Sequence, residues 1–150
     1  MLLVAVVAAA WGGCAVWRSL APDDSKIRWA LEEAVQDFND GRPGYSVAPL
    51  AEEWYDATSG VHRDTLHRAL IGMKWQERDG DWRLVMPAES LVIDVGDGAA
   101  TTTFELQLGR ERESEVEVQW RFAIDADWSD TKDGWKIVRS SHRTLEGRRP

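Results

Sequence analysis

Apolar and polar residues alternate with a period of two along much of the C-terminal half of the chain. The longest run places apolar side chains at Val116, Val118, Trp120, Phe122, Ile124, Ala126 and Trp128. Most residues between them are charged or polar, including Asp125 and Asp127. Such alternation is typical of a strand with one buried and one solvated face. We therefore expect both aspartates to point away from the interior.

The same period marks further strands on both sides of this run. Breaks or turns are expected at Pro87, in "GDG" at 96–98, in "GRERES" at 109–114 and in "SDTKDG" at 129–134. The segment "WKIVRSSHRTL" at 135–145 is expected to form the last strand. Strands joined in sequence by short turns predict an antiparallel meander.

Helical periodicity marks the segment before the strands. Apolar residues recur at spacings of three and four, at Ile27, Ala30, Leu31, Ala34, Val35 and Phe38. This pattern predicts an amphipathic helix that Asp24 or Ser25 caps and that "NDGRPG" ends. A shorter helix is expected across 47–57, with Pro49 in its first turn.

Residues 54–70, "WYDATSGVHRDTLHRAL", contain an unusual number of ionisable side chains. Val61 and Leu66 are spaced to form a hydrophobic staple across the start of a helix. The buried stripe of that helix is expected at Leu66, Ala69, Leu70 and Met73. His62 and His67 would lie about 140° apart around it, at about 100° per residue, so they are not placed to share a metal ion. The pattern favours the start of a helix over a catalytic cluster.

Helices followed by a meander predict an α+β domain, with the helices packed on one face of a curved antiparallel sheet. A length of 150 residues suits one domain, and nine tryptophans supply large side chains for a core or a cavity wall. The net charge of −8 opposes contact with phosphate backbones, so no nucleic-acid partner is expected. Basic residues outnumber acidic ones only near the C-terminus, where we expect a solvated strand and a frayed basic tail at 147–150 rather than an anion site.

The first seventeen residues carry no charged side chain. This run is shorter than the roughly 20 apolar residues of a spanning helix, and it closes on small residues as an export signal does. Its "WGGC" resembles the lipobox of bacterial lipoproteins, with Trp11 where leucine is usual. The resemblance implies a signal peptide at 1–13, a lipidated Cys14, a linker at 14–23 and a place on the membrane of the bacterial cell envelope. An uncleaved signal-anchor and a soluble N-terminus are the alternative interpretations.

The order of elements across residues 24–146 resembles the nuclear transport factor 2-like superfamily, also called SnoaL-like. The resemblance rests on a helix ending "FNDG", on "LAEEWYDATSGVHRDTLHRAL" and on hairpins ending "DGWKIVRSSH". It implies a cone-shaped, cystatin-like domain with a pocket between the helices and the concave sheet. The superfamily includes isomerases, dehydratases, epoxide hydrolases and non-enzymatic modules. The resemblance also implies a homodimer formed through the outer sheet face, but the charged Glu115, Glu117 and Arg121 oppose a dry interface there, so a monomer remains the alternative.

The resemblance directs the search for chemistry to the implied pocket. Tyr55, His62 and His142 are the catalytic candidates, with Asp56 as a further polar group. His142 has the opposite strand parity to Ile137, so it reaches the pocket only if a bulge intervenes. The expected pocket wall includes Trp54, Trp120, Phe122 and Ile137. The sequence has no phosphate-binding loop and no metal-ligand spacing, so no cofactor or metal is expected.

Two functions remain open at this point. The preferred one is a membrane-tethered, non-catalytic module that binds a small apolar ligand or a protein partner. The lipobox-like start, the excess of tryptophan and the lack of a catalytic motif favour it. The alternative is a small isomerase, hydratase or hydrolase that acts on a hydrophobic substrate. An ionisable side chain projecting into an enclosed apolar cavity would reverse this order.

Overall fold

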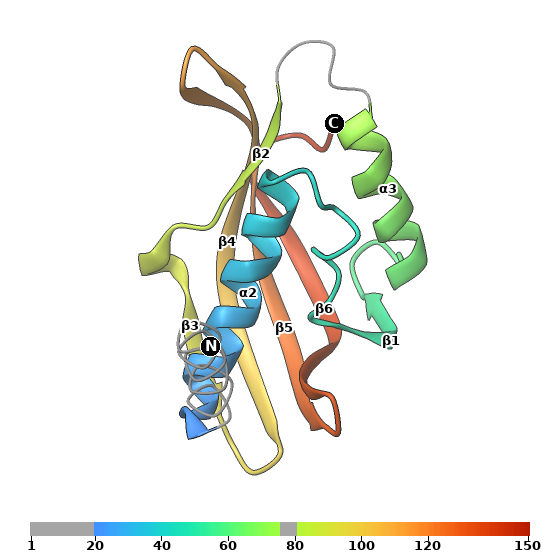
Figure 1. Cartoon of the computed structure of the whole chain (residues 1–150), viewed down its shortest axis with the longest axis vertical. Coiled ribbons are helices and arrows are strands. Elements are labelled where there is room, and N and C mark those ends of the chain that lie inside the picture. Colours follow the sequence, from blue (N-terminus) through green and yellow to red (C-terminus); the bar gives the residue numbers. More distant parts are fainter. Residues whose placement is uncertain (1–19, 76–80) are drawn as a thin grey trace, which may run out of the picture.

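Two helices pack on one face of a curved, open, mixed sheet (Figure 1). The computed structural model describes residues 20–75 and 81–150, so Cys14 and the expected signal at 1–13 lie outside the described residues. Its elements are α2 (Asp23–Asn39), β1 (Leu50–Asp56), α3 (Arg63–Trp75), β2 (Trp82–Val85), the short 3-10 helix η1 (Ala88–Ser90), β3 (Val92–Val95), β4 (Ala99–Arg112), β5 (Glu115–Thr131) and β6 (Gly134–Gly147). The predicted α+β class is confirmed.

The sheet has the strand order β1-β6-β5-β4-β2, and β3 also pairs with β4. All described pairs are antiparallel except β1 with β6, which run parallel. The expected wholly antiparallel sheet is therefore wrong at this one edge. A parallel neighbour needs a long crossover connection, which here consists of everything between β1 and β6 in the sequence.

Helix α2 lies across the sheet and contributes three buried side chains, Ile27, Leu31 and Phe38. It begins directly after Pro22 and has no side-chain cap, so the cap expected from Asp24 or Ser25 is wrong. The helix start is stabilised instead by the negative charges of Asp23 and Asp24, which lie in the first turn at the positive end of the helix dipole.

The last residue of α2, Asn39, ties the helix to the edge of the sheet. Its side-chain amide donates to the carbonyl oxygen of Leu84 and accepts from the Leu84 N–H, both at 2.8 Å. Because β2 is an edge strand, no other described strand pairs with these backbone groups, and the Asn39 side chain satisfies them instead.

The helix expected across 47–57 is wrong, because residues 50–56 form strand β1. The backbone of β6 accounts for the difference: the Ile137 N–H donates to Pro49, and the Ala57 N–H donates to Ser140. Pairing along the sheet edge overrides the helical propensity of a segment rich in alanine and glutamate. As a strand, this segment buries Trp54 and Asp56 and leaves Tyr55 between them 38% exposed.

Helix α3 confirms the helix predicted after residue 61. Val61 and Leu66, the two residues of the expected staple, both pack against the core. The expected buried stripe is only partly right, since α3 has no fully buried residue and Ala69 is exposed. The reason is that this face of α3 borders a cavity, described below, instead of a filled core.

The β4–β5 hairpin is longer than the sequence predicts. Pairing continues to Arg112 and Glu115, so the expected loop at 109–114 is wrong except for its last two residues. Glu113 and Ser114 both have positive φ, 51° and 71°, as a two-residue turn of this kind requires. The hairpin extends past the helices, which leaves Val118 43% exposed despite its place in the apolar run (Figure 1).

A bulge in β6 decides which side chains reach the interior. Trp128 pairs with Ile137 and Asp127 pairs with Arg139, so Val138 has no partner on β5. One extra residue reverses the parity of the strand beyond it. His142 therefore joins the face that carries Ile137. Asp125 and Asp127 are exposed on the outer face, as predicted.

Candidate functional site

A cavity of about 330 Å³ lies between the two helices and the inner face of the sheet. Aliphatic and aromatic side chains form most of its wall. The four expected wall residues, Trp54, Trp120, Phe122 and Ile137, all line it. Its few polar lining groups are Ser46, Asp56, Ser59, Ser140, His142 and Arg149. Small-molecule sites commonly combine an apolar wall with a few converging polar groups in this way.

Asp56 ends β1 and is held by the turn that follows it. Its Oδ1 accepts from the N–H of Thr58 at 3.1 Å, from the N–H of Ser59 at 2.8 Å and from the Ser59 hydroxyl at 2.9 Å. Gly60 completes the turn with a φ of 69°. The sequence "DATSG" thus builds a local turn around the carboxylate, which is only 6% exposed.

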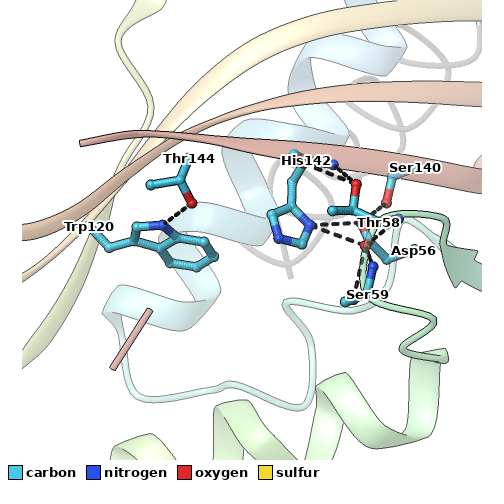
Figure 2. A network of polar contacts seen from close by, with 7 residues as sticks. All are labelled: Asp56, Thr58, Ser59, Trp120, Ser140, His142 and Thr144. Atoms are coloured by element: carbon cyan, nitrogen blue, oxygen red, sulfur yellow. Dashed lines mark hydrogen bonds and ion pairs between the residues drawn. The ribbon is translucent and has the colours of Figure 1, made fainter. Parts of the chain in front are cut away.

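His142 faces this carboxylate from strand β6. Its Nδ1 lies 3.1 Å from both oxygens of Asp56, and Figure 2 shows Nε2 on the opposite side of the ring. Thr58 fixes the backbone of His142 by donating to its carbonyl at 3.0 Å and accepting from its N–H at 2.9 Å. Because an ionised carboxylate only accepts, Nδ1 carries the proton of this contact. Nε2 is then left for other chemistry.

The pKa of Asp56 reflects two opposing effects. Burial raises this pKa, but the hydrogen bonds from His142 and from the backbone and hydroxyl of Ser59 outweigh burial. The net pKa lies below the ordinary value, so Asp56 is ionised at neutral pH. The Ser140 hydroxyl, 3.3 Å from Oδ2, completes the network. A charged, fixed carboxylate is what keeps an adjacent imidazole in one tautomer.

Aromatic rings surround the other side of His142. Trp120 and Phe122 are stacked with their centroids 3.8 Å apart, and both meet the imidazole edge to face. Trp120 Nε1 donates to the Thr144 hydroxyl at 3.0 Å, which fixes the indole (Figure 2). The wall therefore presents a rigid aromatic surface beside Nε2.

The other two catalytic candidates lie away from the cavity. Tyr55 and His62 form an isolated β-bridge, and their rings are 6.4 Å apart. The Arg139 guanidinium lies over the Tyr55 ring on this outer side. Neither residue lines the cavity. Across the part of the chain that the structure describes, no three potential metal ligands gather at one point.

Thr58, Ser59 and Ser140 were not among the residues that the sequence singled out. The signal for two of them was present, because an aspartate followed by threonine, serine and glycine is typical of a side-chain-stabilised turn. Ser140 depends on the bulge at Val138 and has no comparable local signal.

The architecture is that of an α+β domain with a pocket between its two helices and its curved, open sheet. No protein-family model matches the sequence, and a search of curated proteins found no match. Solved structures with the nuclear transport factor 2-like, cystatin-like fold superimpose well on this chain. One from Novosphingobium aromaticivorans has a TM-score of 0.70 and 16% identity, covering 84% of each chain. One from Cytophaga hutchinsonii has a TM-score of 0.59 and 12% identity, covering 83% of this chain and 100% of its own.

A third structure, a nuclear transport factor 2-like protein of unknown function from Pseudomonas putida, gives a TM-score of 0.61 at 14% identity. It covers 84% of this chain and 95% of its own. The domain therefore has the nuclear transport factor 2-like fold. At such low identities the likeness concerns the fold alone.

Proposed function

We propose that this domain is a small acid–base enzyme that acts on a hydrophobic substrate, with His142 as the proton-transfer group and Asp56 as its partner. The observation that carries the proposal is the ionised Asp56 bonded to Nδ1 of His142 at the wall of an apolar cavity. A perturbed carboxylate and a histidine in one cleft are typical of catalytic sites. This geometry reverses the order that the sequence alone favoured.

The chemistry follows from the two ring nitrogens of His142. Asp56 accepts a hydrogen bond from Nδ1–H, so the proton of the neutral ring stays on Nδ1. Nε2 then has a free lone pair that can take a proton from a substrate or a water molecule. The carboxylate then stabilises the imidazolium, and His142 returns the proton to a second substrate atom. Isomerisation, dehydration and hydrolysis by an activated water all need this sequence of transfers.

We expect the protein to turn over at least one of three apolar probes, each of which tests one of these reactions. The probes are a β,γ-unsaturated phenyl ketone for isomerisation, a β-hydroxy phenyl ketone for dehydration and styrene oxide for hydrolysis. Product formation is followed by liquid chromatography against a reaction without protein. Tight binding of the probes with no turnover of any of them would contradict the proposal and would favour the non-catalytic binding module.

We also propose that the N-terminus tethers the domain to a membrane of the bacterial cell envelope through acylated Cys14. The support is the uncharged run before Arg18 and the "WGGC" stretch. Two acyl chains give stable anchoring where one is marginal. In residues 20–75 and 81–150, no helix has the length and hydropathy to cross a bilayer.

Growth of cells expressing the full chain with a radioactive fatty acid is expected to label the protein. Cys14→Ala is expected to remove the label and to release the domain from the membrane fraction, because this chain has no second cysteine. A native protein that takes up no label would overturn the acylation proposal. Membrane retention of the unlabelled protein would then favour the signal-anchor.

A further inference from the structure

Residues 147–150 are exposed, and the end of β6 directs this tail along the mouth of the cavity. Gly147 has a φ of 72°, and a Cβ there would overlap the carbonyl oxygen of Gln119 on β5. The next residue, Arg148, donates its N–H to the same oxygen at 3.3 Å. These contacts turn the chain so that Arg149 and Pro150 line the cavity. In Figure 1 the C-terminal end lies beside the last turn of α3.

The cavity wall contains very few groups that can carry charge. Among the side chains that line it these are Asp56, His142 and Arg149. The charge of Asp56 is matched by the network of donors described above. Arg149 forms no ion pair with any residue in the described part of the chain, and its side chain is exposed. It is therefore the one lining side chain with a permanent positive charge.

We propose that Arg149 is a specificity-determining residue and that the substrate is an apolar acid whose carboxylate binds to it. The inference rests on the proposed function and narrows the substrate class. An apolar body fills the aromatic and aliphatic wall, while the planar guanidinium offers paired N–H donors to the carboxylate. The net charge of −8 repels anions elsewhere on the surface, so this local cation directs an acid to the pocket.

The test compares two probes of the same shape, β-naphthoate and β-naphthamide, by isothermal titration calorimetry on the full chain. The native protein is expected to bind the acid about fivefold more tightly than the amide, as suits an ion pair at the edge of solvent. The preference is expected to shrink as salt is added, because salt screens exposed charges.

Arg149→Gln is expected to abolish this preference while leaving the affinity for the amide unchanged. Arg148→Gln removes the same charge from the neighbouring residue, which does not line the cavity, and is expected to keep the preference. Arg149→Lys retains the positive charge and is expected to keep part of the preference for the acid. These three variants separate a site-specific contact from a general change in net charge.

Equal binding of the two probes by the native protein, or failure of the acid to bind, would overturn the inference. An unchanged preference in Arg149→Gln would overturn it as well. None of these results depends on turnover, so the role of Arg149 and the role of His142 can fail separately. A native protein that prefers the acid but turns over none of the three reaction probes would contradict the proposed enzymatic function and leave the role of Arg149 standing.

Discussion

His142→Asn is expected to lower kcat/KM by between about a hundredfold and ten-thousandfold on whichever of the three probes the native protein turns over. The asparagine amide can still donate to Asp56, so the network around the carboxylate survives. What disappears is Nε2, the only imidazole nitrogen that the network leaves for a substrate. The measurement is steady-state kinetics on the native and variant proteins.

His62→Asn provides the matched control for this variant. His62 lies in a β-bridge with Tyr55 and does not line the cavity, so its replacement is expected to leave kcat/KM unchanged. Circular dichroism and the thermal midpoint check that both variants are folded. Equal activity of His142→Asn and the native protein would remove His142 from the mechanism.

Asp56→Asn is expected to reduce the free energy of unfolding at neutral pH by about 3 kcal/mol. Several donors converge on the buried carboxylate, namely the N–H groups of Thr58 and Ser59, two hydroxyls and His142. An amide has one acceptor oxygen, and its NH₂ group must face one of these donors. The midpoint of urea unfolding measures the loss.

The pH dependence of this effect has a definite sign. The pKa of Asp56 is lowered in the folded protein, so the ionised carboxylate contributes stability above its unfolded pKa of about 3.9. That contribution is lost as the pH falls through the lower, folded pKa. The stability difference between the native protein and Asp56→Asn is therefore expected to be full at neutral pH and to shrink below about pH 4.

Asp127→Asn is the control, since Asp127 is exposed on the outer face of the sheet. It is expected to change the urea midpoint little at any pH. A stability difference for Asp56→Asn that stayed constant down to about pH 3 would show that the ionised carboxylate does not stabilise the fold.

The fold was largely predictable because its two layers have different hydrophobic periods. The recurrence from Ile27 to Phe38 indicated α2, and the alternation through Trp128 indicated β5. Strand β1 could not be recognised in this way. Its backbone is satisfied by β6, far away in the sequence, and local propensity carries no information about that partner.

The site was predictable only in part, for a related reason. Its aromatic wall follows from the period of β5, which places Trp120 and Phe122 on the inner face. Its chemistry depends on two events that periodicity does not encode. One is the parallel pairing of β1 with β6, which turns Asp56 inward. The other is the bulge at the unpaired residue Val138, which turns His142 inward.

That unpaired residue, Val138, gives the fold a simple way to gain or lose its reactive group. Deleting this one position would remove the bulge before His142 and turn the side chain of His142 to the opposite face of the sheet. The helices and the aromatic wall would persist, but the imidazole would lie in solvent on the far side. Two proteins that differ by this single inserted residue could thus have the same apolar pocket. The proposed proton-transfer group would face the pocket in one of them and solvent in the other, which could then only bind a ligand.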